Sequence, residues 1–335
     1  MFDIPVLSFG EFSITLYAIL AAVLCLAAAI FLTVRLRRRG WSTGQALLCC
    51  IIAGFLGLLL GRALYCAVRI DFFLDPETGE SIHLPSVLDL SLGGICVTGV
   101  IAGLFLGGWL VSKCLKKDPV PLFDTASVPG LVLFALLSFI EPLSGQGYGP
   151  VLSLPVFCWP PLGIQNGFGE WILSVSFLEG LLLLLAAGLV CRLRLRRPGN
   201  PILSALVLVS SFMIIPESLR QDDVLQVFVF ARVTQLGYCV MLIISAILIW
   251  RNCARLGLSR RTIALDALLL LLHIAILVGG EFALDKFTWP DILIYLAMAL
   301  VLIGTAWLLM YRIRFIEKPR NQKTMNTISG VSSHE

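Results

Sequence analysis

The sequence contains little charge for its length, and this shortage excludes most soluble folds. Of its 335 residues only 14% are Asp, Glu, Lys or Arg, and three are histidine. A soluble domain carries about a quarter charged residues. The basic residues form no stripe interleaved with aromatic side chains, so we expect no nucleic-acid partner.

Several common site patterns are missing as well. None of the ten cysteines forms a Cys-x-x-Cys pair, although Cys49 and Cys50 are adjacent, and we interpret the cysteines as small buried apolar residues. There is no P-loop, no hydrolase triad and no histidine cluster, so we expect neither a metal ion nor a cofactor. The first twelve residues are acidic rather than basic, which favours a retained first helix over a cleaved signal peptide.

The sequence is instead rich in long apolar segments. Hydrophobic residues form 58% of the chain, and a helix needs about 20 apolar residues to cross a membrane. Four segments contain no Asp, Glu, Lys or Arg, namely residues 14–34, 90–112, 233–250 and 292–311. Five weaker segments are residues 44–61, 125–140, 171–191, 202–216 and 267–280. The sequence therefore predicts an all-α integral membrane protein, a bundle of about nine transmembrane helices.

The charges alternate in sign from one connection to the next. Most of the 25 Lys and Arg residues follow the first, third, fifth, seventh and ninth apolar segments. The other connections carry mainly acids, among them Glu141, Glu217 and Glu281. Because positively charged loops stay in the cytoplasm, the N-terminus is predicted outside and the C-terminus inside the cell. Residues 316–335 would form a polar cytoplasmic tail.

Ionisable residues at membrane depth are the first functional candidates, because each is costly there. Arg62 and Tyr65 follow the second segment; Arg62 is suited to hold a lipid phosphate, or it only extends to the interface. Glu179 lies within the fifth segment, where a carboxylate is expected to have a partner inside the bundle rather than to face lipid.

Two further stretches are rich in glycine. Residues 93–108 surround Thr98 with small residues that allow close helix packing, and packing is the better interpretation of most of them. Residues 138–149 form a polar bend whose irregular backbone must be buried in protein or line a wet cavity. Within that bend, Glu141 is either a pocket acid or an ordinary loop acid.

A last cluster of charges, residues 217–223, follows the sixth segment. Glu217 and Arg220 are three residues apart and could form a local pair on one helix face. The alternative is an interfacial charge cluster that binds no substrate. Twelve residues on, Arg232 and Gln235 open the next apolar segment.

Taken in order, these motifs resemble those of the prolipoprotein diacylglyceryl transferase family. The motifs are a Tyr in the first segment (Tyr17), GRxxY after the second (residues 61–65), a glycine-rich third segment (93–108), a GxxYG loop (145–149), Leu-Glu in the fifth (178–179) and E-x-x-R-Q-x-D after the sixth (217–223). The resemblance covers residues 12–250. It implies a seven-span transferase-like membrane domain over residues 1–250, with residues 251–315 as two additional transmembrane helices.

The resemblance also implies an activity and a location. The family is found in the bacterial plasma membrane, where its members are multi-pass proteins. They move the diacylglyceryl group of phosphatidylglycerol to the thiol of the lipobox cysteine in a prolipoprotein signal peptide, and glycerol phosphate is released. Phosphatidylglycerol and the signal peptide are therefore the expected partners.

The roles of individual residues follow from the same resemblance. Arg220 and Arg62 would bind the phosphate that leaves, because charge-assisted hydrogen bonds in a dry site are strong. Glu217 and Glu179 would orient these arginines, and Glu141 would serve as the carboxylate base. The remaining substrate-binding residues are expected to be Tyr17, Tyr65, Gln235, Gly149 and Thr98.

Some positions differ from the usual family pattern. Thr98 stands where many members have histidine, Ser138 and Glu141 stand where an arginine and an asparagine are usual, and Gln146 replaces a glutamate. These differences motivate a second hypothesis, an inactive relative that binds anionic lipid or a lipoprotein signal peptide. A third hypothesis, a small membrane transporter, has less support because no inverted repeat is visible.

Overall fold

In the computed structural model the described residues are 5–9, 12–73, 87, 94–221, 232–287 and 290–318, with backbone alone for 5–14 and 71–72. Gly93, Asp222, Asp223 and most of the predicted tail, residues 319–335, lie outside the described residues.

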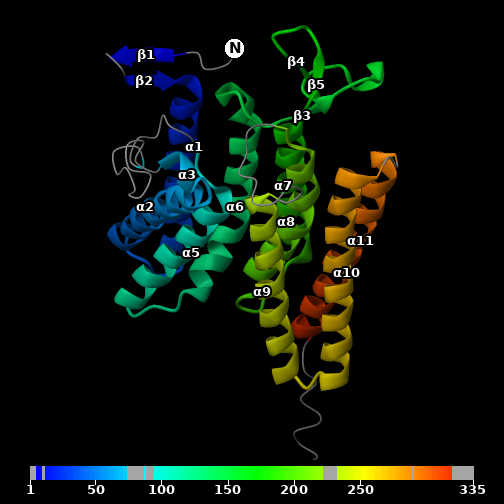
Figure 1. Ribbon diagram of the computed structural model, residues 1–335. Helices are drawn as coiled ribbons and strands as arrows, with labels where there is room; N and C mark the ends of the chain where they lie inside the picture. Colours follow the sequence, from blue (N-terminus) through cyan, green and yellow to red (C-terminus); the bar gives the residue numbers. More distant parts are fainter. Residues whose placement is uncertain are drawn as a thin grey trace, which may run out of the picture.

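Nine helices in the described ranges are long and apolar enough to cross a membrane, and they form a bundle (Figure 1). They are α1 (Leu16–Arg37), α2 (Thr43–Val68), α5 (Val97–Cys114), α6 (Val120–Ile140), α7 (Val175–Leu193), α8 (Asn200–Leu219), α9 (Val233–Arg255), α10 (Arg260–Lys286) and α11 (Asp291–Glu317). A short helix, α3 (Ile70–Phe73), follows α2. The expected bundle of apolar helices is confirmed.

Two small antiparallel sheets lie at one end of the bundle, which we call the strand end (Figure 1). The first sheet pairs β1 (Pro5–Phe9) with β2 (Phe12–Thr15). The second joins β3 (Tyr148–Val151) and β4 (Gly163–Gln165) to the two sides of β5 (Trp171–Ser174), with 3₁₀ turns η1 (Glu141–Ser144) and η2 (Pro155–Phe157) in the same connection. The opposite end, where Arg- and Lys-bearing connections join α1 to α2, α5 to α6, α7 to α8 and α9 to α10, is called the basic end.

Local signals explain where several helices begin. The Ser42 hydroxyl oxygen accepts from the Gln45 amide, and the Gln45 side-chain oxygen accepts from the Ser42 amide. These two bonds form a capping box at the start of α2. Thr15 and Ser259 cap α1 and α10 in the same way with their hydroxyl oxygens. Such caps satisfy amides that would otherwise lack partners at a helix start.

Helix α8 is the central element of the bundle. It contacts α6, α7, α9 and α11, and buried residues occur on nearly every turn along its length. The main apolar core brings together Met213 and Ile214 of α8, Leu183 of α7, Tyr238 of α9 and Met298 of α11. The last helices of the chain therefore share one core with the earlier ones.

Several elements differ from the segments predicted from hydropathy; α5, for example, begins at Val97 rather than at residue 90. α2 continues to Val68, so Arg62 and Tyr65 lie inside its last two turns rather than after it. Residues 171–174 form strand β5, and α7 begins only at Val175. α10 extends to Lys286, well beyond the predicted residue 280. A window of apolar residues measures hydropathy alone. It cannot distinguish a short strand from a helix, and it cannot show where backbone hydrogen bonds extend a helix past polar residues.

Glycines allow α2 and α5 to approach closely. A Cβ atom on Gly103 would lie 2.2 Å from the Leu56 carbonyl oxygen, and one on Gly99 would lie 2.6 Å from that of Leu60. On Gly107 it would lie 2.5 Å from the Cα of Ala53. The interpretation that packing explains most of these glycines is confirmed, since small residues let membrane helices touch through their backbones.

Candidate active site

Arg220 is the centre of a buried ion cluster close to the strand end. Its Nη1 donates to both carboxylate oxygens of Glu179 on α7, at 3.1 and 3.3 Å, and its Nη2 pairs with Glu141 of η1. Arg220 and Glu179 are only 7% and 6% exposed. Removing one partner of such a buried pair costs about 3–5 kcal/mol, because an uncompensated charge stays behind.

The local geometry of Arg220 differs from the expected helix face. α8 ends at Leu219, and Arg220 follows it with an extended backbone (φ −65°, ψ 137°). The spacing of three residues between Glu217 and Arg220 therefore does not place them one turn apart on a helix. The residues that pair with Arg220, Glu179 and Glu141, come from elements 41 and 79 positions earlier in the chain.

The polar bend after α6 attaches directly to the Arg220 segment. The amide of Gln221 donates to the carbonyl of Tyr148 at 2.8 Å, and the Tyr148 hydroxyl donates to the Pro142 carbonyl at 3.1 Å. A Cβ on Gly149 would lie 2.6 Å from Cγ2 of Val175 and 3.0 Å from the Leu219 carbonyl oxygen. Gly149 therefore lets β3 pack against the residue before Arg220.

Glu141 is the more accessible of the two carboxylates on Arg220. Its side chain is 18% exposed, against 8% for that of Glu179. It begins the 3₁₀ turn η1 directly after α6, and Gly147 passes so close that a Cβ there would lie 3.4 Å from the Glu141 carboxyl carbon. Of the two, Glu141 is the better placed to meet a molecule that enters from the strand end.

A second buried carboxylate, Glu217, is held by the start of α9. Its Oε2 accepts from the Thr234 hydroxyl at 2.7 Å. Beside Thr234, the Gln235 side chain accepts from the Arg232 amide at 3.0 Å and donates to the Ile214 carbonyl at 3.3 Å. Glu217, Thr234 and Gln235 are each at most 5% exposed, so side-chain hydrogen bonds fix this junction of α8 and α9.

Two tyrosines lie within electrostatic range of the cluster. Tyr17, near the start of α1, interacts with the charges of Glu141 and Arg220, and α1 packs against η1. Tyr238 of α9 is 5% exposed and interacts with Glu217, Glu179 and Arg220. Tyr17 was predicted for the site, whereas Tyr238 was not.

Arg62 belongs to a separate group on α2. Its Nε donates to the Val87 carbonyl at 2.9 Å and its Nη1 to the Gly94 carbonyl at 3.2 Å. Its guanidinium carbon also lies 5.4 Å from the Tyr65 ring centre and 5.2 Å from that of Phe73. Arg62 is 8% exposed, so it is buried against aromatic rings, a favourable place for a guanidinium.

Thr98 and its neighbours pack against α9. The Thr98 hydroxyl lies 3.2 Å from Sγ of Cys96, and a Cβ on Gly237 would lie 2.4 Å from Cγ2 of Thr98. Cys96 also packs with Val233 and Tyr65. Thr98 therefore touches α9 at Gly237, two residues after Gln235.

The charges of the cluster define its chemistry. Glu141, Glu179 and Glu217 all lie in range of the Arg220 guanidinium. A guanidinium offers five N–H donors in a planar fork that matches a carboxylate or a phosphate. An incoming phosphate can therefore take the place of one carboxylate on Arg220. The carboxylate that it replaces becomes available to accept a proton.

Three residues of this region were not assigned to the site from the sequence. Thr234 and Tyr238 sit in an apolar segment and carry no charge, so hydropathy gave no signal for them. Glu281 was placed in a connection, one residue beyond the predicted eighth segment, whereas it lies inside α10. Within the described ranges, no three His, Cys, Asp or Glu side chains are arranged to hold a metal ion.

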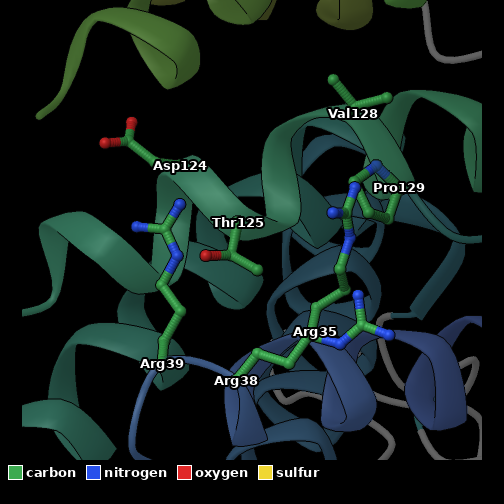
Figure 2. A pocket seen from close by; sticks show the side chains of 7 residues that line it. All are labelled: Arg35, Arg38, Arg39, Asp124, Thr125, Val128 and Pro129. Atoms are coloured by element: carbon green, nitrogen blue, oxygen red, sulfur yellow. The ribbon is translucent and has the colours of Figure 1, made fainter. Parts of the chain in front are cut away.

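A hollow of about 230 Å³ lies at the basic end, between α1 and α6 (Figure 2). Arg35, Arg38 and Arg39 line one side, and Asp124 and Thr125 lie across from them. The Arg39 guanidinium points toward Asp124 in Figure 2. Asp124 accepts from the Gly199 and Ile202 amides at 2.8 and 3.2 Å, so it caps the start of α8.

Comparisons with known proteins agree with the resemblance. A family model for prolipoprotein diacylglyceryl transferase matches residues 5–251. Two proteins named phosphatidylglycerol–prolipoprotein diacylglyceryl transferase, from two strains of Clostridium kluyveri, are each 24% identical over 161 residues. That alignment covers 48% of this chain and 60% of each relative, so the chain spans less than two thirds of the length of these curated relatives.

Proposed function

Because this chain belongs to the prolipoprotein diacylglyceryl transferase family, we propose that it transfers the diacylglyceryl group of phosphatidylglycerol to the lipobox cysteine of a prolipoprotein. The observation that carries the proposal is the buried Arg220, held by Glu179 and by the more accessible Glu141. A guanidinium in this setting is suited to bind a phosphate in a site of low dielectric. The transporter hypothesis offers no comparable role for the cluster.

In the proposed reaction the cysteine thiol loses its proton, and the sulfur attacks the glycerol carbon of the lipid that carries the phosphate ester. A sulfur–carbon bond forms, the carbon–oxygen bond to the phosphate breaks, and glycerol phosphate leaves with the bonding electrons. Arg220 binds the phosphate and stabilises the charge that develops on its oxygen. Removing a preorganised donor of this kind lowers the rate by about 10²–10³-fold.

Glu141 is the proposed base. When the phosphate binds Arg220, it competes with the Glu141 carboxylate for the same guanidinium. The displaced carboxylate then accepts the thiol proton, which is needed because the thiolate is the nucleophile and a free cysteine has a pKa of about 8.5. Glu179, the more buried partner, stays on Arg220 and keeps its orientation. Glu217, held by Thr234, anchors the end of α8.

The residues outside the cluster are assigned to substrate binding. Tyr17 lies in range of Glu141 and Arg220, where its hydroxyl can bond the lipid headgroup. Arg62 and Tyr65 form the second group, and Thr98 lies beside Cys96 and Gly237. Gln235, whose side chain bonds Arg232, Ile214 and Glu281, is assigned instead to holding the junction of α8 and α9. Gly149 contributes backbone room for β3 beside Leu219. We place the strand end outside the bacterial plasma membrane, because the basic end fits the cytoplasmic side.

The proposal is tested with purified protein in vesicles and a synthetic lipobox peptide. Vesicles of phosphatidylglycerol should yield a peptide heavier by one diacylglyceryl group, and vesicles of phosphatidylethanolamine, or a peptide with Ser in place of the lipobox Cys, should not. Peptide that binds without gaining mass would support the inactive relative and overturn the proposal. Solute flux without modified peptide would support a transporter instead.

A further inference from the structure

The last two long helices lie beyond the part of the chain that matches the family, yet they reach the polar residues beside the cluster. The match ends at residue 251, and α10 begins at Arg260. Glu281 on α10 accepts from the Ser218 hydroxyl at 2.9 Å through Oε2 and from the Gln235 amide group at 2.9 Å through Oε1. Each carboxylate oxygen thus bonds a different helix, α8 or α9.

The position of Glu281 is fixed by the packing of α10 on α11. A Cβ on the preceding residue, Gly280, would lie 2.8 Å from the Met298 sulfur atom, and Met298 is 1% exposed. Tyr295 is also on α11, and its hydroxyl lies 3.4 Å from the Ser218 hydroxyl. The carboxylate therefore has a defined place from which to hold α8 and α9.

The two residues that Glu281 holds are direct neighbours of the proposed site. Ser218 follows Glu217 and lies two residues before Arg220. Gln235 follows Thr234, the hydrogen-bond donor to Glu217, and its Oε1 bonds the Arg232 amide. A shift of Ser218 or Gln235 therefore changes the placement of Glu217 and Arg220, and small misplacements of catalytic groups are costly.

We propose that Glu281 is a positioning residue for the transfer reaction, and that α10 and α11 complete the site from outside the family-matched region. Glu281 acts through Ser218 and Gln235 and does not touch the reacting atoms. This inference rests on the proposed function. It also assigns a task to the two additional helices.

The test uses an exchange of charge between two bonded residues. In Glu281→Gln one carboxylate oxygen is replaced by an NH2 group, so the side chain can no longer accept from both the Ser218 hydroxyl and the Gln235 amide group. In the double variant Glu281→Gln/Gln235→Glu, the carboxylate at 235 accepts from the Arg232 amide and from the new amide at 281. The amide oxygen at 281 still accepts from Ser218. The double variant thus restores the bond between positions 235 and 281 with its polarity reversed, and it loses the donor from position 235 to the Ile214 carbonyl.

The matched control is Asp266→Asn, in the same helix pair. Asp266 accepts from Nε and Nη2 of Arg312 on α11 at 2.6 and 2.8 Å, so its loss also weakens α10 on α11. It lies 15 residues before Glu281, which is about 22 Å along a helix axis. Asp266→Asn therefore reports loosening of the helix pair without a change beside the cluster.

We expect Glu281→Gln to lower kcat about tenfold or more with little change in the KM for peptide, since a misplaced catalytic group slows the chemical step. The double variant should recover part of the lost kcat, because the bond to Ile214 is still missing, and Asp266→Asn should lower Tm while kcat stays near wild type. Ser218→Ala, which deletes only one donor to Glu281, should show a smaller loss and serves if Glu281→Gln does not fold.

Two results would overturn the inference. One is that both Glu281→Gln and Ser218→Ala keep the wild-type kcat. The other is a loss that the double variant does not reverse and that Asp266→Asn reproduces at equal Tm. If the wild-type protein itself transfers no lipid, the proposed function fails and the inference fails with it, and this outcome is distinct from an active wild type with an active Glu281→Gln.

Discussion

At the scale of single residues, the two carboxylates on Arg220 have different environments and should have different roles. Glu141 is the more exposed and begins a short turn, whereas Glu179 is buried in α7. The difference favours Glu141 as the residue that gives way to a phosphate. Glu179 is then the structural partner that keeps the guanidinium in place when no lipid is bound.

Replacing Glu141 by Gln removes the proposed base but keeps its size. We predict that kcat falls about 10²–10⁴-fold, the usual contribution of a general base. The KM for lipid should stay equal or decrease, because the neutral side chain competes less with phosphate for Arg220. Steady-state kinetics over a range of lipid content in the vesicles checks both values.

The control for this prediction is Glu170→Gln. Glu170 is an exposed acid in the same connection, and its carboxylate accepts from the Asn166 side chain at 2.9 Å. Its kcat should stay within about twofold of wild type, since an exposed interaction of this kind is worth little. Equal loss of activity in both variants would contradict the assignment of Glu141.

Gly149 tests the contact between β3 and the Arg220 segment. The Cβ in Gly149→Ala would approach the Leu219 carbonyl oxygen and Val175 too closely, so β3 or Arg220 must shift. We predict at least a tenfold loss of kcat/KM, of the order expected when catalytic groups are displaced. Gly167→Ala, in the same connection with no atom within 4 Å of the added Cβ, should remain active; similar losses in the two variants would count against this contact.

At the scale of elements, close contact between α2 and α5 fixes the position of α2, which carries the Arg62 group. Gly103→Ala places a methyl group against the Leu56 backbone, so the two helices must separate. Overpacking of this kind destabilises by about 1–3 kcal/mol, and we predict a measurable decrease in Tm. Gly130→Ala in α6 meets no atom within 4 Å and should not decrease it; a Gly103→Ala protein with unchanged Tm would contradict the packing.

The sequence predicts the long helices but not the side chains that meet at Arg220. The apolar segments predicted every long helix, because length and hydropathy are local properties. The partners of Arg220 could not be derived in the same way, since Glu179 and Glu141 are 41 and 79 residues away and only the packing of α6, α7 and α8 joins them. Glu281 was overlooked because its Ser218 and Gln235 partners are distant in sequence.

At the scale of the whole molecule, the arrangement separates two ends with different charge. Gln221, next to Arg220, bonds β3 of the strand end, and both sheets lie at that end (Figure 1). The hollow lined by Arg35, Arg38 and Arg39 (Figure 2) lies at the end of α1 that leads into the basic connection to α2. We propose that the basic end is cytoplasmic, where arginines also meet anionic lipid headgroups. A phosphatidylglycerol molecule would then reach Arg220 from the outer leaflet.

Labelling of intact cells with a membrane-impermeant maleimide tests this orientation. Phe168 is 92% exposed in the connection between β4 and β5, so Phe168→Cys should be labelled from outside. The exposed Cys114 and Cys191 at the basic end should react only after the membrane is opened, and the double variant Cys114→Ser/Cys191→Ser should remove that signal. The Phe168→Cys protein also carries Cys158→Ser, so that the partly exposed Cys158 in the same connection does not contribute to the label. Labelling of Cys114 in intact cells, with Phe168→Cys protected, would reverse the proposed orientation.

Phosphate binding by Arg220 is tested by following both products in the same phosphatidylglycerol vesicles. Wild-type protein should release one glycerol phosphate for each modified peptide. Arg220→Ala and Arg220→Lys should slow both products together, by about 10²–10³-fold for the alanine variant, whereas Arg251→Ala at the basic end should not. Wild-type rates from Arg220→Ala, or glycerol phosphate released without modified peptide, would contradict the account.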